Sequence, residues 1–375
     1  MAENLAVTGF VLWRDKPGEA PRYQYGTLHV RDGRCVQFMR EPPPSSSTHK
    51  YVVPGFVDMH AHLAISGGAA TSEEITDHAW SQIRAGVLAV REPGSPVKVS
   101  ASELPYGRPL LITAGRHIAV ERRYIRGLAV ELPASEMPGG RWPRALAQVI
   151  SEQSKSGDGW VKLVGDWIDR TGGPSSDLQP LWTEEELREG VRAAHDLGVK
   201  VGVHIFGSRG IDELLDAGVD SIEHGSGMSP SQMRRAAAQG TVVVPTLMQV
   251  LKFPQFADAA TRYPKYAQTM RELYERRREW FTDLVASGVQ ILPGSDAGGY
   301  QSHGSLVQEM VTMVQWGMAV GDVLDAATWK ARDFLGLASL STGAPADAVV
   351  FGADPRVHAD IWASPTYVIA AGHRV

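Results

Sequence analysis

From residue 51 onward, short hydrophobic runs alternate with longer stretches in which apolar residues recur at helical spacing. The runs are rich in valine, isoleucine and leucine and are apolar at successive positions, which is typical of parallel strands covered by helices on both faces. They read YVVPGFVDMH, GVLAVRE, PLLITAG, WVKLVGD, VKVGVHI, VDSIEHG, TVVVPTLM and VQILPGSD. Eight strand–helix units predict an α/β fold, a closed (β/α)8 barrel of the TIM type.

The stretches between the runs carry signals for helix starts and ends. Thr183 and Glu186 have the spacing of a capping box, and Gly198 suits the left-handed end of the same helix. Two later helices end in the same way at Gly218 and Gly240. An open, doubly wound sheet is the alternative architecture, but no glycine-rich phosphate loop follows the first run.

Both ends of the chain have a strand-like pattern broken by turns, so they are expected to pair into one small β-sandwich. The predicted organisation is therefore residues 1–50 for its N-terminal part, 51–338 for the barrel and 339–375 for its C-terminal part. Two segments, 117–142 and 251–268, are longer than simple connections. Long loops on such a scaffold commonly form lids or binding loops, which is the expectation here.

Composition narrows the class of protein. The 375 residues are 43% hydrophobic, enough for the large core of such a barrel. A net charge of -5 and the lack of a dense basic stripe argue against nucleic acid as a partner. Cys35 is the single cysteine, so an intrachain disulfide is excluded, as is a cysteine-rich zinc site. No signal peptide or membrane span is apparent, and we expect a cytoplasmic protein that could form a homo-oligomer.

Two histidines end the first hydrophobic run. Successive side chains of a strand point to opposite faces, so His60 and His62 point the same way. Buried imidazoles need polar partners, and a shared metal ion would satisfy both. The alternative is a pair of core histidines bonded to nearby carbonyl groups.

Other polar residues stand at the corresponding ends of later runs. In a (β/α)8 barrel these ends form one mouth, where the active site lies. The residues are Lys162 in the fourth run, His204 in the fifth, His224 in the sixth and Asp296 in the eighth. Any one of them could be an isolated core residue, but their convergence with His60 and His62 favours a metal site.

The sequence resembles the amidohydrolase superfamily at these motifs. The features are PGFVDMHAHL after a strand-rich N-terminus, single histidines on the fifth and sixth strands, GSDAG on the eighth, and the closing GAPADAVVF. The segments VREPG, EHGSGM and SHGSLVQEMVTMVQWGM resemble in particular the branch of imidazolonepropionase-like hydrolases and Xaa-Pro dipeptidase-type enzymes.

The resemblance implies two divalent metal ions, with Zn²⁺ as the expected metal, and a lysine that captures CO2 as a carbamate. The implied ligands are His60, His62 and Asp296 for one ion, His204 and His224 for the other, and carboxylated Lys162 between them. Asp296 would also act as general base and then general acid. The alternative is that Lys162 pairs with Asp296 in a one-metal site.

Substrate contacts are expected beyond the third and eighth runs. The candidates are His117, Arg122, Arg123, Tyr124, Arg126 and His303. One of the arginines could bind a substrate carboxylate through paired hydrogen bonds, or the segment could be a solvated loop. The resembling branch usually has Gly-Gly-His before this segment, whereas this chain has Gly115, Arg116 and His117. His303 could contact substrate or cap the following helix.

These features predict a metal-dependent hydrolase that cleaves an amide bond in a peptide or an N-acyl amino acid, including peptide processing in a biosynthetic pathway. Hydrolysis of a cyclic amide, such as an imidazolone or a lactam, is the first alternative. A mononuclear deaminase usually has an acid beside the histidine of the fifth strand, and VGVHIFG has none. An inactive scaffold would have lost ligands, and none is lost in the sequence.

Overall fold

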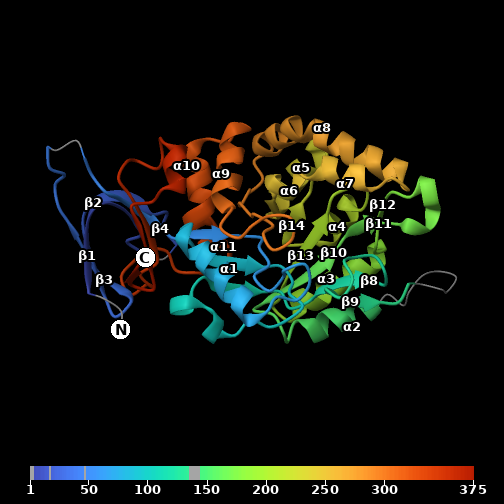
Figure 1. The fold of residues 1–375 in the computed structure, drawn as a ribbon, viewed down its shortest axis with the longest axis horizontal. Helices are drawn as coiled ribbons and strands as arrows, with labels where there is room; N and C mark the ends of the chain where they lie inside the picture. The colour runs from blue at the N-terminus through green and yellow to red at the C-terminus, as the bar shows by residue number, and fades with distance from the viewer. Residues whose placement is uncertain (1–3, 17, 46–47, 135–143) are drawn as a thin grey trace.

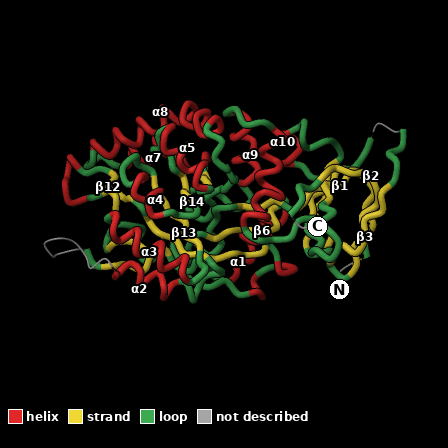
Figure 2. Tube along the Cα trace, turned by 180° about the vertical axis from the view of Figure 1, so that it is seen from behind, coloured by secondary structure: helices red, strands yellow, loops and turns green. Residues whose placement is uncertain are grey.

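The computed structural model describes residues 4–16, 18–45, 48–134 and 144–375. A barrel of parallel strands and surrounding helices is joined at one end to a sheet built from strands near both ends of the chain (Figure 1). The view from behind shows the same two parts, with the sheet to one side of the helix-covered barrel (Figure 2).

Both ends of the chain contribute to a single seven-stranded sheet, in the order β18-β17-β16-β4-β1-β2-β3. Its strands are β1 (Leu5–Trp13), β2 (Arg22–Arg31), β3 (Arg34–Arg40), β4 (Tyr51–Pro54), β16 (Ala348–Phe351), β17 (Tyr367–Ala370) and β18 (His373–Arg374). The sheet folds over on itself so that its edge strand β3 approaches the segment before β16. A hydrogen bond shows this approach: the backbone N–H of Cys35 in β3 donates to the carbonyl of Ala344 at 2.9 Å. Val11, Leu28 and Val350 belong to its own hydrophobic core.

The barrel strands form two parallel sheets, β5-β6-β7 and β15-β14-β13-β10-β8-β9. Their bounds are β5 (Phe56–Asp58), β6 (Val87–Glu92), β7 (Leu110–Thr113), β8 (His117–Val120), β9 (Ala129–Leu132), β10 (Trp160–Val164), β13 (Lys200–Ile205), β14 (Ser221–His224) and β15 (Val242–Val244). Residues 290–293 close the ring: Leu292 N–H donates to Val243 at 3.1 Å, and Met59 N–H donates to Pro293 at 3.0 Å. The predicted combination of a barrel with a sheet from both chain ends is confirmed.

The structure divides three of the eight predicted runs differently. The first run splits at Gly55, because β4 pairs with β1 and β16 in the terminal sheet and only β5 enters the barrel. The terminal sheet thus extends past the expected boundary at residue 50. Two strands share the place of the third barrel strand: β7 pairs with β6 on one side, and β8 pairs with β10 on the other. The eighth run makes only the isolated bridge between Val243 and Ile291.

Helices cover the outside of the barrel (Figure 1). They are α1 (Ser72–Arg84), α2 (Arg144–Gln153), α3 (Glu184–Asp196), α4 (Ile211–Ala217), α5 (Pro230–Gln239), α6 (Leu247–Val250), α7 (Phe253–Ala259), α8 (Pro264–Ala286), α9 (Leu306–Gln315), α10 (Val320–Asp325) and α11 (Ala331–Phe334). The predicted capping box of Thr183 and Glu186 is present at the start of α3. Gly218 and Gly240 end α4 and α5 in the left-handed conformation, as expected.

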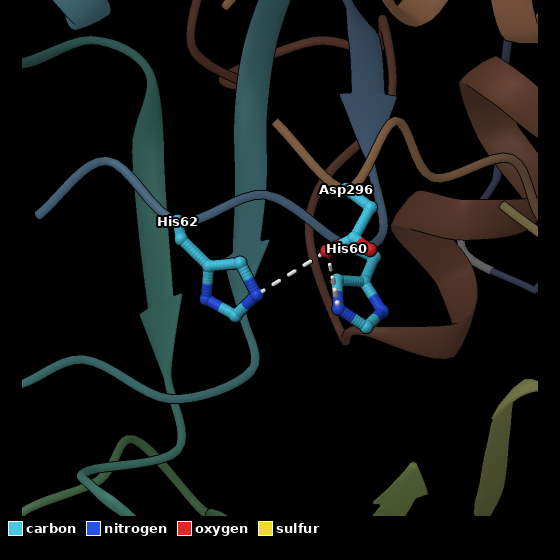
Figure 3. A group of neighbouring side chains, drawn as sticks. All are labelled: His60, His62 and Asp296. Carbon is cyan, nitrogen blue, oxygen red and sulfur yellow. Dashed lines mark ion pairs between the residues drawn. The ribbon is translucent and has the colours of Figure 1, made fainter. Parts of the chain in front are cut away.

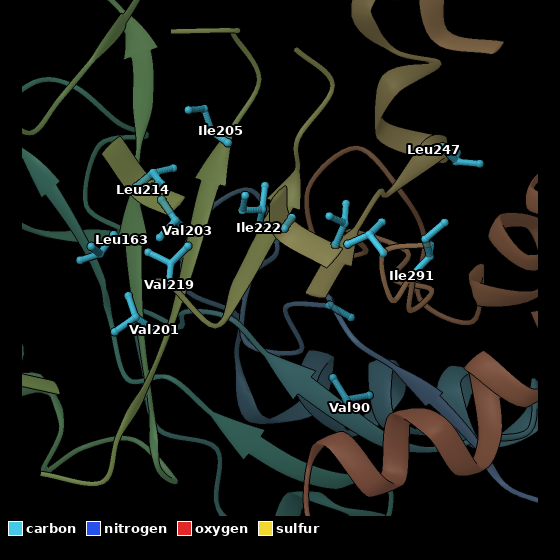
Figure 4. Packing of buried hydrophobic residues seen from close by; sticks show 14 of the residues in the cluster. Val90, Leu163, Val201, Val203, Ile205, Leu214, Val219, Ile222, Leu247 and Ile291 are labelled. Carbon is cyan, nitrogen blue, oxygen red and sulfur yellow. The ribbon is translucent and has the colours of Figure 1, made fainter. Parts of the chain in front are cut away.

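The main hydrophobic core lies between the barrel strands and these helices (Figure 4). Leu163, Val203 and Ile222 are fully buried on neighbouring strands and pack with Leu214 of α4. This layer explains the continuously apolar runs, because the strand face turned to the helices is as dry as the face turned to the barrel interior.

The two segments expected to be long loops contain regular structure. Residues 117–142 include β8 and β9, with 135–142 outside the described residues, and 251–268 include α7 and the start of α8. A short hairpin of β11 (Asp166–Ile168) and β12 (Leu178–Pro180) follows β10. Within the described part of the chain, no helix has the length and apolar character needed to cross a membrane.

A buried ion pair joins the terminal sheet to the barrel. Asp347, just before β16, accepts from Nε of Arg108, just before β7, at 2.7 and 2.8 Å, and also from the N–H of Ala371. The side chain of Asp347 is 1% exposed and that of Arg108 is 10% exposed. Water therefore cannot replace either partner.

We expect Asp347→Ala to lower the free energy of unfolding by about 3–5 kcal/mol, because it leaves the Arg108 charge buried without its partner. Urea unfolding followed by tryptophan fluorescence measures this loss. Asp258→Ala is the matched control, since it removes a solvent-exposed ion pair with Arg271 and should cost no more than about 1 kcal/mol. Equal losses in the two variants would contradict a structural role for the buried pair.

Candidate active site

The six predicted ligands all line one cavity of about 1470 Å³ at the C-terminal mouth of the barrel. His60 and His62 lie just after β5, and Asp296 lies after the closing segment 290–293. The other three are Lys162 in β10, His204 in β13 and His224 at the end of β14. Tertiary structure thus brings together side chains from five separate regions of the chain.

His60, His62 and Asp296 form the tightest part of this group (Figure 3). One carboxylate oxygen of Asp296 lies 3.2 Å from Nε2 of His60 and 3.5 Å from Nε2 of His62. In the described part of the chain, these three residues form the group whose ligand atoms are close enough to hold one metal ion. One ligand atom from each lies within 4.8 Å of the other two.

The hydrogen bonds of His62 show that this group suits a cation. Its Nδ1 lies 2.8 Å from the carbonyl oxygen of Gly94, which can only accept, so Nδ1 carries the proton. Burial lowers the pKa of His62, which favours the neutral ring. Its Nε2 then directs a lone pair toward the carboxylate oxygen of Asp296. Two such acceptors face each other without repulsion when a metal ion lies between them.

A buried carboxylate orients His60 in the same way. Glu223 in β14 accepts from Nδ1 of His60 at 2.8 Å, from Nη2 of Arg91 at 2.5 Å and from Oγ of Ser221 at 2.7 Å. Arg91 in β6 spans the barrel interior to make this pair, and both side chains are at most 1% exposed. Burial alone would raise the pKa of Glu223, but Arg91 and Lys162 hold it well below its usual range. Glu223 therefore stays charged and leaves Nε2 of His60 free for a metal.

Gly202 leaves the room that this network occupies. It lies beside Lys162 in the pairing of β10 with β13. A Cβ at this position would lie 2.9 Å from Oγ of Ser221 and 3.1 Å from Oε1 of Glu223. A side chain here would push the carboxylate away from His60.

Asp58 fixes the distance between the two chain segments that carry the ligands. Its buried carboxylate accepts from the N–H of His60 at 3.1 Å, from the N–H of Ser295 at 2.9 Å and from Oγ of Ser295 at 2.5 Å. The N–H of Asp296 in turn donates to the carbonyl of His60 at 2.7 Å. These bonds hold the carboxylate of Asp296 against the two histidines.

His204 and His224 face each other beside this group, with ring centroids 4.7 Å apart. Nδ1 of His224 lies 2.6 Å from Oγ1 of Thr246, which leaves Nε2 as the ring nitrogen available to a metal ion. Nε2 of His204 is buried and has no hydrogen-bond partner among the described residues. Burial and the neighbouring Lys162 lower the pKa of His204 to about 3, so the ring is neutral and able to bind a metal.

Lys162 is 1% exposed and lines the same cavity. Burial is the main cause that lowers its pKa to about 8, with Arg91 acting in the same direction and Glu223 and Asp296 opposing it. A lysine in this range has a substantial fraction of neutral amine near neutral pH. The neutral amine is the form that could react with CO2.

Backbone strain is concentrated at the same place. His224, Thr246 and Asp296 have φ values of 66°, 45° and 55°, in the left-handed region that residues other than glycine rarely adopt. Each such residue costs on the order of 1–3 kcal/mol, which the surrounding structure must offset. Strain held at two candidate ligands and at the hydrogen-bond partner of one of them indicates a functional site.

The predicted substrate residues Tyr124, His117 and His303 differ in how they lie relative to the cavity. Tyr124 lines the cavity, and its ring centroid lies 6.2 Å from that of His204. His117 is buried 5.4 Å from the ring of His62 but is absent from the cavity lining, and its Nδ1 has no partner among the described residues. His303 stacks on His78 at 4.0 Å, away from the lining. A contact of His303 with substrate stays a prediction.

Two of the three predicted arginines, Arg122 and Arg126, lie at the rim of the cavity. Arg122 lines the cavity edge, but its side chain is 89% exposed and lies 3.6 Å from the carboxylate of Glu121. Arg126 is also exposed and lines the edge. Among the described residues, no hydrogen bond or ion pair directs either guanidinium toward the ligand group.

Sequence reasoning missed several residues of the site. Glu223 directly precedes His224, and Arg91 stands within the second run, so both could be seen as charged residues inside apolar strands. A charged residue in such a run must find a buried partner, which is the signal that could have revealed them. An aromatic wall of the cavity gave no such signal, because its members come from a strand, helices and loops that are separate in the sequence: Trp167, Phe256, Tyr263, Tyr266 and Tyr300.

Comparison with known sequences identifies the family. Residues 166–375, which include His204, His224 and Asp296, match the amidohydrolase family. An uncharacterized protein of Mycobacterium tuberculosis is 38% identical over 350 residues, covering 92% of this chain and 90% of that protein. The chain belongs to the amidohydrolase family. The expected resemblance is confirmed, and this amidohydrolase is a metal-dependent hydrolase acting on carbon–nitrogen bonds.

Solved structures share the fold of the amidohydrolase. A Xaa-Pro dipeptidase with bound methionine superposes with a TM-score of 0.78 at 23% identity, covering 98% of each chain. An ochratoxinase from A. niger has a TM-score of 0.74 at 17% identity, covering 99% of this chain and 96% of that one. A molinate hydrolase has a TM-score of 0.71 at 18% identity, covering 100% and 95%. At these identities the likeness establishes the architecture.

We expect Glu223→Gln to weaken zinc binding by roughly 10- to 100-fold, because a neutral amide orients His60 poorly and leaves Arg91 without its counter-charge. Competition with a chromogenic chelator measures the dissociation constant. Glu275→Gln, an exposed substitution on α8, is the matched control and should bind zinc as the unchanged protein does. Equal zinc affinity in the Glu223 variant, with native circular dichroism, would contradict this role.

Proposed function

We propose that this amidohydrolase uses two divalent metal ions to cleave an amide bond in a peptide or an N-acyl amino acid. The observation that carries the proposal is the convergence of four histidines, a buried lysine and an aspartate on one cavity at the barrel mouth. Two-metal sites suit the hydrolysis of unactivated amides, because they clamp both the attacking water and the substrate oxygen.

In this proposal, His60, His62 and Asp296 hold one ion, and His204 and His224 hold the other. Lys162, converted to a carbamate by reaction of its neutral amine with CO2 and loss of one proton, would be the ligand shared by the two ions. The burial and lowered pKa of Lys162 support this assignment, because a charged ammonium would repel the ions. The neutral imidazoles of His62 and His204 support zinc as the metal.

The ions would lower the pKa of bound water and polarise the substrate carbonyl, which is the chemistry they supply when bound. Asp296 takes the proton of the attacking water and returns it to the leaving nitrogen. Glu223 keeps His60 in the required tautomer. The hydroxyl of Tyr124 stays protonated, since burial raises its pKa, and it can donate to the substrate oxygen from the cavity wall.

The size and lining of the cavity support a peptide-like substrate. Its volume of about 1470 Å³ exceeds the roughly 300–1,000 Å³ of a typical small-ligand pocket, which favours an extended substrate over a small cyclic amide. The aromatic wall provides apolar surface for an acyl group or side chain. The structures that share the fold include a Xaa-Pro dipeptidase with methionine in its active site and an ochratoxinase, which is consistent with this choice.

Metal content tests the two-ion site directly. Protein produced with added zinc and bicarbonate should hold about two zinc equivalents per chain, measured by mass spectrometry. Lys162→Ala should hold one or fewer, because it removes the bridging ligand, whereas the exposed control Lys98→Ala should keep both. One equivalent unaffected by Lys162→Ala would indicate a mononuclear site and return deaminase chemistry to consideration. No tightly bound metal would favour the scaffold alternative.

Replacing the proposed general base separates catalysis from metal binding. Asp296→Asn should retain zinc, because the four histidines and Lys162 still hold the ions, but should lower kcat by roughly 10²- to 10⁴-fold, because an amide cannot accept the proton of the attacking water. Initial rates on a panel of N-acyl amino acids and dipeptides, with zinc measured in the same samples, provide the test. Near-normal turnover with bound zinc would refute this role for Asp296.

A further inference from the structure

One arginine of the segment after β8 differs from its neighbours in how it is held. Nη2 of Arg123 donates to Oδ2 of Asp169 at 2.9 Å, and the two side chains are 23% and 30% exposed. Both residues line the cavity. The side chain of Arg122 is 89% exposed and lies 3.6 Å from Glu121, and the exposed Arg126 has no hydrogen bond or ion pair with the described residues.

Asp169 is itself fixed, so it can act as a rigid support. Its other oxygen, Oδ1, accepts from the N–H of Thr171 at 3.0 Å and from Oγ1 of Thr171 at 2.7 Å. Burial alone would raise the pKa of Asp169, but these hydrogen bonds and the charge of Arg123 lower it. The carboxylate therefore stays ionised and holds the guanidinium in one orientation.

The donors of Arg123 are not all used. Nη1 is buried and has no hydrogen-bond partner among the described residues. A buried, charged N–H without an acceptor costs free energy, so such groups in native structures usually serve a ligand. An arginine that is oriented through one nitrogen and unsatisfied at another is suited to bind a second carboxylate.

The pair also lies beside the proposed reaction centre. Arg123 directly precedes Tyr124, and Asp169 follows Trp167 by two residues. The rings of Tyr124 and Trp167 are 4.9 Å apart, and that of Trp167 is 5.5 Å from the ring of His204. The two segments that carry the ion pair thus meet next to a proposed metal ligand.

We propose that Arg123, oriented by Asp169, binds a carboxylate that the substrate carries close to the scissile amide. This inference rests on the proposed function and narrows its substrate class. The substrate is an N-acyl amino acid, or a short peptide cleaved at its C-terminal residue, and the free carboxylate is required for efficient binding. Arg123 is a specificity-determining residue, and Asp169 is a positioning residue that acts through it.

Matched substrate pairs test the proposal. Each pair is an N-acyl amino acid and its carboxamide, which differ only in the charge next to the amide that is cleaved. The zinc-loaded enzyme should prefer the acid, and Arg123→Gln should lower kcat/KM for the acid on the order of 10- to 100-fold. The same variant should change kcat/KM for the carboxamide by less than about threefold, since an effect on the charge alone leaves the rest of the site intact.

Three further variants make the comparison specific. Arg123→Lys should recover part of the preference, because an ammonium keeps the charge but not the planar pair of donors. Arg126→Gln tests the competing rim arginine, and Arg188→Gln, on the outside of α3, is the neutral control. Loss of the acid preference in the Arg126 variant, with the Arg123 variant unaffected, would overturn the assignment.

A binding measurement separates this proposal from the function on which it rests. Free amino acids and their amides are titrated into the zinc-loaded protein by calorimetry, without any turnover. Tighter binding of acids than amides, lost in Arg123→Gln, supports the carboxylate site even if no amide is cleaved. Equal affinity for acids and amides in the unchanged protein, or an equal loss of both in the variant, would show that Arg123 has a structural role only.

Discussion

The site depends on one buried carboxylate that joins the beginning of the barrel to its end. Asp58 accepts hydrogen bonds from the backbone of His60 and from the backbone and side chain of Ser295. Residues more than 200 positions apart along the chain are thereby held at a fixed distance, and Asp296 follows directly against the two histidines. The contacts that join the two ends of the barrel therefore also position the ligand group.

Charge balance inside the barrel follows from that assembly. Imidazole nitrogens that face a carboxylate with their lone pairs would be unfavourable in a dry interior without a cation. The buried ion pair between Arg91 and Glu223 orients these groups so that a cation can bind. Arg91 keeps Glu223 ionised, Glu223 fixes the proton of His60, and the free nitrogen of His60 faces Asp296. Arg91 thus orients Glu223, and Glu223 orients His60, which is how buried polar networks become rigid and specific.

Beyond the ligand group, the cavity is asymmetric in chemistry. Aromatic rings from α7, α8 and the loop after Asp296 form an apolar wall, whereas the segment after β8 brings an arginine held by an aspartate. An amide with an apolar acyl group on one side and a carboxylate on the other fits this distribution. In the proposed function, the barrel supplies the hydrolytic chemistry, and these loops and helices select the substrate.

The sequence by itself determined the architecture and the ligand candidates. Continuously apolar runs required strands buried on both faces, capping boxes and glycines marked the helix ends, and histidines or an aspartate at the run ends could meet only at the barrel mouth. The eighth run shows the limit of this reasoning. It has the apolar pattern of a strand, yet residues 290–293 form only the isolated bridge of Ile291 with Val243 and backbone hydrogen bonds to Val243 and Met59.

Tertiary structure decided what each polar group does. No local pattern distinguishes Arg123 from Arg122 and Arg126, because the distinction lies in Asp169, which a separate hairpin brings to it. Glu223 likewise gains its role from Arg91 on a strand across the barrel. Hydrophobic periodicity is a property of neighbours in sequence, so it predicts elements and their buried faces. Hydrogen bonds between side chains on different elements depend on distances that only the packed chain sets.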